Sequence, residues 1–395
     1  HVYNGDSMLD TEQAIKTVFL LVFFLIYGGI HLYLFLEAKI ALSFGTRTSL
    51  CVAIFMLAMV LAPVIVHVSE RKGLESLAVF FSWMGYIWMG VAFLMLCLFL
   101  LCDCYRILIH LGAHLFSFDP STLIPSARHC FISVLVLAIA LALYGSVEAL
   151  RIRTEAITIR TAKIPKEIGT FRIVQISDLH LGLIVRERRL ERILREVRIA
   201  APDMLVSTGD LVDGETDNLS GLTNLLRDVE PAYGKFAVTG NHEFYAGLDQ
   251  SLAFTKNAGF TVLRGEMEEV RGFFTVAGFD DPTGGVYHTE SGIPESELLA
   301  GLPDERFVLL LKHQPVVSKG SSKRFDLQLS GHTHKGQIYP FSLLTRLAFS
   351  FNSGQYRLTD GAILYVSRGS GTWGPPMRLL APPEITIIDL IHDGS

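Results

Sequence analysis

Five short segments in the second half of the chain carry acidic side chains, an asparagine or histidines directly after an apolar run. They read SDLHLG, TGDLVDG, TGNHEF, LLKHQP and SGHTHKG, and they supply seven candidate metal ligands: Asp178, His180, Asp210, Asn241, His313, His332 and His334. Carboxylate oxygens and imidazole nitrogens without a thiolate suit manganese, iron or zinc. Seven ligands exceed what one ion takes and suit two ions that share a bridging carboxylate. We therefore expect a two-metal site, a recurrent device for phosphoryl transfer because two cations about 3.5 to 4 Å apart hold the attacking and leaving oxygens together.

The elements that must position these segments form an alternating pattern of strands and helices from about residue 170 onward. We expect strands over 171–176, 204–208, 235–239, 273–277, 307–311, 326–329, 363–366 and 384–389, and helices over 187–199, 219–229 and 248–258. Such alternation predicts an α/β domain with helices covering a sheet. Ligands of open α/β sheets bind outside the carboxyl ends of the strands, so the five segments are expected to meet there. Without that convergence, His332 and His334 would fit equally well as two solvated imidazoles on one face of a strand.

The order of the segments resembles that of the calcineurin-like metallophosphoesterases, whose pattern is D-x-H, G-D-x-x-D, G-N-H-[D/E], H and G-H-x-H. Every element of that pattern stands in order over roughly residues 170–390: Asp178-Leu179-His180, Gly209-Asp210-Leu211-Val212-Asp213, Gly240-Asn241-His242-Glu243, His313, and Gly331-His332-Thr333-His334. The resemblance implies the family's fold, a two-sheet sandwich flanked by helices.

The resemblance also implies a role for each matching residue. One ion would be held by Asp178, His180, Asp210 and His334, and the other by Asp210, Asn241, His313 and His332, with Asp210 as the bridge. Similar enzymes use the histidine at the place of His242 to protonate the leaving oxygen, and Asp213 is the candidate partner that orients its ring. The alternative for His242 is a hydrogen bond that only holds the turn.

A later stretch, YVSRGSGTWGPPMRLLAPPEITII, looks like a membrane-associated branch of the same superfamily, whose members share an S-R-G-x-G-x-W-G-P-P-M-R loop before the last strand. Relatives in that neighbourhood include the hydrolases that cleave UDP-diacylglucosamine in lipid A synthesis. Lys335 stands directly after G-H-T-H, where many members have glycine, and it would either reach a phosphate or be solvated. Candidate substrate contacts are therefore Lys335, Arg368 and Trp373.

The first 150 residues have a different composition, with 16 of the chain's 73 charged side chains. Apolar stretches over about 15–36, 50–68, 77–102 and 131–150 are long enough to cross a bilayer as helices. We expect a four-helix transmembrane domain over 1–150 and a catalytic domain over 151–395. Residues 1–7 precede the first methionine, Met8, and are expected to be a remnant of cloning. The stretch 105–118 between the third and fourth spans is expected to be a separate helix lying in the membrane interface.

Charge and cysteine usage bound the location and the partners. All five cysteines lie in the membrane half, so no disulfide framework is expected. The net charge of −5 does not favour a nucleic-acid partner. Four spans place the N-terminus and the catalytic domain on one side. Basic residues slightly favour that side as the cytoplasmic one, six against four: Lys16, Arg71, Lys72, Arg151, Arg153 and Arg160 against Lys39, Arg47, Arg106 and Arg128. We expect a multi-pass protein of the plasma (inner) membrane.

Two surface segments and the number of spans favour a lipid-linked substrate, since four spans exceed what anchoring needs. An arginine-rich helix over 185–199 would meet anionic headgroups or simply be solvated with its apolar face on the sheet. The apolar stretch 339–354 after His334 would be an exposed membrane contact or a buried loop core. The expected function is metal-dependent hydrolysis of a phosphodiester or pyrophosphate bond in a lipid-linked or nucleotide-lipid substrate. The alternatives are a tethered phosphoesterase for a soluble nucleotide or phosphoprotein, and a non-catalytic membrane scaffold or sensor.

Overall fold

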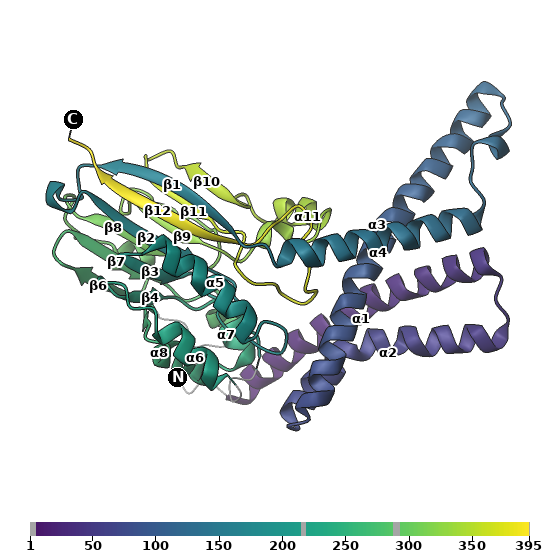
Figure 1. The fold of residues 1–395 in the computed structure, drawn as a ribbon, viewed down its shortest axis with the longest axis horizontal. Coiled ribbons are helices and arrows are strands. Elements are labelled where there is room, and N and C mark those ends of the chain that lie inside the picture. Colours follow the sequence, from purple (N-terminus) through teal and green to yellow (C-terminus); the bar gives the residue numbers. More distant parts are fainter. Residues whose placement is uncertain (1–4, 215–218, 287–292, 395) are drawn as a thin grey trace. The chain divides into compact units, whose positions relative to one another are not determined.

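The computed structural model describes residues 5–214, 219–286 and 293–394 of the chain. It divides into two compact units, one of His1–Ser146 with Gly374–Met377 and one of Val147–Trp373 with Arg378–Ser395 (Figure 1). Of the segment expected to be a cloning remnant, residues 1–4 lie outside the described residues, and 5–7 open the first helix.

The first unit is built from long apolar helices. They are α1 (Gly5–Leu42), α2 (Thr46–Arg71), α3 (Glu75–Phe116) and α4 (Ala127–Ala149). Each contains a segment long and apolar enough to cross a membrane, in agreement with the expected spans. Polar side chains join these helices, as in membrane bundles: Trp88 donates from Nε1 to His31 at 2.8 Å, and Tyr33 donates to Asp103 at 2.6 Å. The cysteines are free, as expected.

The prediction of a separate helix over 105–118 is wrong, because most of this stretch belongs to α3. The helical backbone of α3 continues without a break to Phe116, where Ser117 ends it in the left-handed conformation. No proline interrupts residues 100–116, and a single glycine, Gly112, does not end a helix when its neighbours are good helix formers. The polar residues at 103–106 therefore mark the end of the apolar part of α3, and the helix itself continues beyond them.

The second unit contains two six-stranded sheets (Figure 1). The first has the order β1 (Arg153–Thr161), β12 (Glu384–His392), β2 (Thr170–Ile176), β3 (Met204–Ser207), β4 (Lys235–Ala237) and β5 (Thr261–Val262). The second has the order β10 (Gly354–Arg357), β11 (Ile363–Val366), β9 (Leu327–Ser330), β8 (Phe307–Leu311), β7 (Phe274–Gly278) and β6 (Glu266–Val270). Strands β2 to β5 are parallel, and so are β7, β8, β9 and β11.

Apolar side chains from both sheets form one buried core, which contains Ile173 and Val206 from the first sheet and Val276, Leu309 and Leu329 from the second. Two sheets that share a core in this way form a sandwich. A second core lies between the first sheet and the helices α5 (Glu187–Ala200), α6 (Ser220–Arg227) and α8 (Leu248–Asn257). The expected two-sheet α/β architecture flanked by helices is therefore confirmed.

The central strands and the main helices begin and end within a few residues of their expected positions. Four strands were not expected: β1, β5, β6 and β10. Each of them is an edge strand of its sheet. Short helices absent from the prediction are α7 (Asn241–Ala246), α9 (Thr283–Val286), α10 (Glu295–Leu298) and α11 (Phe341–Ala348).

Helix α5 settles one alternative left open by the sequence. Its apolar side chains Leu190, Ile193, Leu194 and Val197 are fully buried against the first sheet. Arg189 is half-buried and donates to the carbonyl oxygen of Ser370 at 3.4 Å. The helix thus has the arrangement of an ordinary surface helix, with its apolar face on the sheet and most arginines in solvent.

Candidate metal centre

The five motif segments lie where the sheet topology predicts, at the carboxyl ends of parallel strands. Asp178 follows β2, Asp210 follows β3 and Asn241 follows β4, while His313 follows β8 and the His332 turn follows β9. The first three strands belong to one sheet and the last two to the other. The candidate site is therefore built across the edge of the sandwich, with both sheets contributing ligands.

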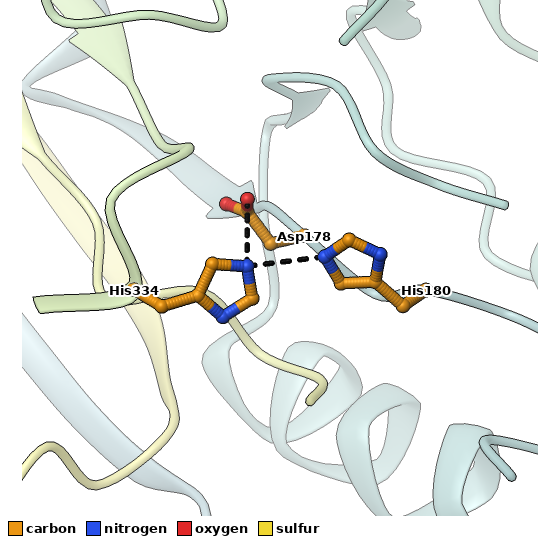
Figure 2. A group of neighbouring side chains, drawn as sticks. All are labelled: Asp178, His180 and His334. Atoms are coloured by element: carbon orange, nitrogen blue, oxygen red, sulfur yellow. Dashed lines mark hydrogen bonds and ion pairs between the residues drawn. The ribbon is translucent and has the colours of Figure 1, made fainter. Parts of the chain in front are cut away.

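One group of side chains consists of Asp178, His180 and His334, whose ligand atoms all lie within 4.8 Å of one another (Figure 2). His334 Nε2 lies 3.1 Å from Asp178 Oδ1 and 3.0 Å from His180 Nε2. All three side chains are buried. Figure 2 shows the two rings pointing toward each other beneath the carboxylate.

A second group consists of Asp210, His313 and His332, also within 4.8 Å of one another. His313 Nε2 lies 3.2 Å from Asp210 Oδ2, 3.1 Å from His332 Nδ1 and 3.2 Å from Asn241 Oδ1. The three other side chains expected around the second ion thus all lie 3.1 to 3.2 Å from His313 Nε2.

Asp210 lies between the two groups. Its Oδ2 atom is 3.2 Å from His313 Nε2 and 3.7 Å from His180 Nε2, so one carboxylate faces both. Its other oxygen, Oδ1, accepts the backbone N–H of His242 at 2.9 Å. The Asp210 carboxylate is therefore close to the nitrogen ligands of both groups.

The backbone at the site is held in a conformation that side chains rarely adopt. Asp178, His180, Asp210, His332 and His334 all have φ between 47° and 70°. Such left-handed backbone costs a non-glycine residue about 1 to 2 kcal/mol and persists only where surrounding structure enforces it. The concentration of these conformations at five of the seven predicted ligands marks the site as specialised for function.

Two motif glycines are required by close packing at this place. A Cβ on Gly240 would collide with the Asp210 side chain, and a Cβ on Gly331 would collide with Ser177 and with the Asp178 carboxylate. The glycines of the G-N-H and G-H-x-H motifs therefore let two turns approach the carboxylates of the site.

The charges of the site reinforce one another. Burial alone would raise the pKa of Asp210, but the neighbouring His313 and His242 outweigh it and hold the pKa well below the usual range. Burial and then the proximity of His313 lower the pKa of His332 to about 4. Burial likewise lowers the pKa of His334 to about 4, against the opposing effect of Asp178. At neutral pH the carboxylates are thus ionised and His332 and His334 are neutral, the forms that bind metals. Burial opposes the charged form of His313, but Asp210 outweighs burial and raises the pKa of His313 well above its usual range, so a cation must displace that proton.

The residues fit a pair of divalent cations. His313 Nδ1 lies 2.8 Å from the carbonyl oxygen of Thr208, so Nδ1 keeps its proton and Nε2 is the nitrogen that faces the site. His180 Nδ1 lies 3.4 Å from Asp213 Oδ1, which leaves Nε2 facing the site as well. The donor set contains only hard oxygens and imidazole nitrogens, and it suits manganese, iron or zinc.

His242 and Asp213 lie beside the ligands as a pair. His242 Nδ1 is 2.7 Å from Asp213 Oδ1, a distance typical of a charge-assisted hydrogen bond. The ring also lies within ligand distance of His180 and Asp210, but its Nδ1 is committed to Asp213. Burial opposes the charged form of His242, and the carboxylates of Asp210 and Asp213 outweigh burial and raise its pKa to about 9.

The three predicted substrate contacts differ in their surroundings. Trp373 is 53% exposed, and its ring lies 5.9 Å from that of His242. Lys335 is half-buried, with φ of 52°, which explains why a glycine suits this position. The Arg368 guanidinium lies 2.5 Å from both Glu155 and Glu384. Those ion pairs favour a structural role for Arg368, and substrate binding by any of the three stays a prediction.

Sequence reasoning assigned no role to two buried charged residues that hold the site together. Glu243 accepts hydrogen bonds from the backbone N–H groups of Gly240, Asp210 and Leu211 at 2.6 to 3.0 Å, so it fastens the second motif turn to the third. Arg378 is fully buried and donates to the carbonyl oxygens of Gly371 at 2.6 Å, Arg368 at 2.7 Å and His334 at 3.2 Å. The sequence signal for Glu243 was its place as the last residue of the G-N-H-E motif. The only signal for Arg378 was its place as the last residue of the S-R-G-x-G-x-W-G-P-P-M-R loop, residues 367–378, which we call the distal loop.

Comparison with known proteins agrees with this geometry. Residues 171–336 match the family model described as calcineurin-like phosphoesterase. An uncharacterized metallophosphoesterase from Aquifex aeolicus is 43% identical over 262 residues, which are 66% of this chain and 99% of that protein. A transmembrane protein with metallophosphoesterase domain from Danio rerio is 31% identical over 277 residues, 67% of this chain and 63% of its own length.

Among solved structures, a putative 5'-nucleotidase from Staphylococcus aureus matches with 13% identity and a TM-score of 0.34, over 57% of this chain and 55% of that one. A Pseudomonas putida nuclease matches with 16% identity and a TM-score of 0.27, over 51% of this chain and 77% of that one. Likenesses this distant carry no information about the substrate.

Proposed function

This chain belongs to the calcineurin-like metallophosphoesterase family, and from that premise we propose that it is a membrane-integrated hydrolase with a two-metal site that cleaves a phosphodiester or pyrophosphate bond in a lipid-linked or nucleotide-lipid substrate. The observation that carries the proposal is the position of Asp210, whose Oδ2 faces His313 at 3.2 Å and His180 at 3.7 Å. A carboxylate between two groups of nitrogen and oxygen ligands is within reach of a cation in each group, and two cations about 3.5 to 4 Å apart stabilise both the attacking and the leaving oxygen of a phosphate.

The proposed ligands of one cation are Asp178, His180, Asp210 and His334, and those of the other are Asp210, Asn241, His313 and His332. Two divalent cations, most simply manganese, would neutralise the phosphate and lower the pKa of a bound water. Contacts outside the site orient two of these ligand rings. The Thr208 carbonyl oxygen contacts His313 Nδ1, and the Asp213 carboxylate lies 3.4 Å from His180 Nδ1.

His242 is the proposed general acid. Its Nδ1 is held by Asp213 at 2.7 Å, so the proton that it gives to the substrate resides on Nε2. When water attacks phosphorus and the bond to the leaving oxygen breaks, that oxygen takes the Nε2 proton. The raised pKa of His242, about 9, keeps the ring protonated at neutral pH for this step. Asp213 acts through His242 and is a positioning residue.

The membrane half supports an amphiphilic substrate. Four membrane-competent helices exceed the one that tethering requires, and Trp373 places a half-exposed indole beside His242, where it is available to an apolar or aromatic part of a substrate. Lys335 offers a cation for a phosphate. We place the protein in the plasma (inner) membrane as a multi-pass protein with its catalytic domain on the cytoplasmic side, on the balance of basic residues.

The test uses the full chain reconstituted in lipid vesicles with manganese. Hydrolysis of CDP-diacylglycerol, a pyrophosphate with two acyl chains, is compared with hydrolysis of bis(p-nitrophenyl) phosphate, a soluble diester, for the wild type, Asp210→Asn and His242→Ala. We expect the lipid to be the better substrate by kcat/KM and Asp210→Asn to abolish both activities. His242→Ala is expected to lower kcat/KM for CDP-diacylglycerol about 100-fold or more.

Each proposal has its own contradicting result. Equal or faster turnover of the soluble diester would favour the soluble nucleotide or phosphoprotein alternative over the lipid. Hydrolysis that survives in Asp210→Asn would exclude the bridging role. No hydrolysis of any phosphate ester by the metal-loaded wild type would favour the non-catalytic scaffold or sensor.

A further inference from the structure

Helix α11 turns its apolar side chains away from the catalytic unit. Leu343, Leu344 and Leu347 are 51, 55 and 85% exposed. The side that faces the unit is polar: Ser342 packs so closely on Gly336 that a Cβ there would collide with the Ser342 backbone, and Thr345 donates to the Ser342 carbonyl at 3.1 Å. A surface helix in water has the opposite arrangement, with its leucines on the core.

The exposed apolar surface extends beyond α11. Tyr339, just before the helix, is also exposed, and its N–H donates to the carbonyl oxygen of Leu379 at 3.1 Å. Leu380, the next residue, is 57% exposed. We call Tyr339, Leu343, Leu344, Leu347 and Leu380 the apolar face. Contiguous apolar surface of this kind on a folded domain marks contact with a membrane or a protein.

Hydrogen bonds connect the apolar face to the place where the chain leaves its last membrane-competent helix. The N–H of Leu380 donates to Glu148 Oε2 at 3.2 Å, and Glu148 lies in the last turn of α4. Arg153, the first residue of β1, pairs with the same carboxylate at 3.4 Å. Since only residues 150–152 separate α4 from β1, the apolar face begins at the membrane exit of the chain.

Cations accompany the apolar face. Arg346 is exposed on α11 between Leu344 and Leu347. Lys335, a second basic residue, is half-buried and stands six residues before α11 in the chain. An apolar surface bordered by arginine and lysine is the pattern of a helix that lies in a membrane interface with anionic lipids.

We propose that the apolar face is a membrane-docking surface: α11 lies flat in the interface of the same leaflet that α4 leaves, with Leu343, Leu344 and Leu347 among the upper acyl chains and Arg346 at the lipid phosphates. With eight residues, α11 is about 12 Å long and cannot cross the bilayer. Docking of the face does not require the proposed activity.

Docking deepens the proposed activity, and this further step rests on the proposed function. α11 begins seven residues after His334, and Phe349, just after its end, places its ring 5.1 Å from the His332 ring. The helix thus follows the metal-ligand turn in the chain, and the residue after its end contacts His332. A lipid that stays in its leaflet would then present its phosphate to the metal centre without leaving the membrane.

The first experiment measures docking alone. In a full-length chain whose five cysteines are replaced by serine, Leu347→Cys is labelled with an environment-sensitive fluorophore. The chain is reconstituted in vesicles of phosphatidylethanolamine and phosphatidylglycerol at about three to one. The matched control is Ile199→Cys, an apolar residue of α5 that is 71% exposed and lies outside the apolar face. We expect the label at 347, but not at 199, to be quenched by lipids with a doxyl group high on the acyl chain and shielded from aqueous iodide.

Two results would overturn docking. Iodide quenching at 347 equal to that at 199 would mean that the face is in water. A label at 347 shielded from both iodide and doxyl lipid would mean that protein, such as a second copy of this chain, covers the face.

The second experiment tests what docking does for catalysis. The double substitution Leu343→Asp, Leu347→Asp is expected to lower kcat/KM for CDP-diacylglycerol in vesicles at least tenfold, while bis(p-nitrophenyl) phosphate is hydrolysed within twofold of the wild type. Ile199→Asp should leave both rates unchanged. An unchanged rate on the lipid would overturn the presentation role. If the wild type hydrolyses no lipid at all, the proposed substrate fails, and the fluorescence result still decides docking.

Discussion

Replacing Arg378 by methionine should weaken metal binding and the fold together, although Arg378 is not a predicted ligand. The side chain is completely buried, and burial, followed by the neighbouring Arg189, lowers its pKa to about 9. Its guanidinium donates to the carbonyl oxygens of Gly371, Arg368 and His334 and approaches His334 Nδ1 at 3.0 Å. It therefore ties the distal loop to the turn that carries two predicted ligands.

The size of the effect follows from these contacts. Methionine fills similar space but leaves the buried carbonyl groups of Gly371 and Arg368 without their donor, at about 1 to 3 kcal/mol each, whereas the carbonyl group of His334 keeps the N–H of Gln337. Partial relaxation and entry of water reduce the total to about 3 to 5 kcal/mol, as for other buried charges that lose their partners. For a catalytic unit of this size, that loss lowers Tm by roughly 10 °C. Since the His334 ring loses its support, metal affinity should fall about 10- to 100-fold.

The assay combines thermal unfolding with calorimetric titration of manganese into the purified full-length chain. The control is Arg172→Met, which removes a bidentate pair with Asp389, at 2.7 and 2.9 Å, on β2 and β12 at a distance from the metal centre. It should lower Tm without changing manganese affinity. Arg378→Lys should recover little, because one ammonium cannot replace the planar fork of donors. Manganese affinity within twofold of the wild type in Arg378→Met, with Tm lowered as in the control, would refute the reasoning.

Three further changes test individual features of the site. Lys335→Gly removes a side chain from left-handed backbone, at φ of 52°, and should stabilise the fold by about 1 kcal/mol in thermal unfolding; a lower Tm would show that the lysine contributes more than its backbone strain costs. Asp213→Asn removes one of the two carboxylates that raise the pKa of His242, so that pKa should fall. The alkaline limb of the kcat/KM profile, where the acid loses its proton, should then move to lower pH; an unmoved limb would exclude His242 as the acid. Gly240→Ala places a Cβ against Asp210 and should abolish metal binding and turnover together, whereas normal turnover would mean that the two turns do not pack as described.

The sequence was sufficient to predict which residues meet, because the ligand-bearing segments directly follow strands whose carboxyl ends share one edge of a sandwich. Asp178, Asp210 and Asn241 follow neighbouring parallel strands, so their proximity follows from topology. The central strands were predictable for a related reason: they are buried on both faces and read as continuous apolar runs.

The remaining features depend on tertiary context that a local pattern does not contain. Strand β1 is half exposed, and its polar residues Arg153, Thr154 and Glu155 do not form a strand pattern until β12 pairs with it. The support of the metal turn by Arg378 joins residues 44 positions apart. The apolar composition of 339–354 was visible in the sequence, but only the backbone of α11 shows that its leucines face outward, which excludes the buried loop core.

The most direct test of the account is electron paramagnetic resonance of the full-length chain titrated with manganese. If Asp210 joins two cations, the wild type should bind two manganese ions per chain and give the spectrum of an exchange-coupled pair, since ions about 3.5 to 4 Å apart interact magnetically. Asp210→Asn should lose that coupling. Binding of a single ion, or of two ions that remain uncoupled at saturation, would contradict the shared-carboxylate centre.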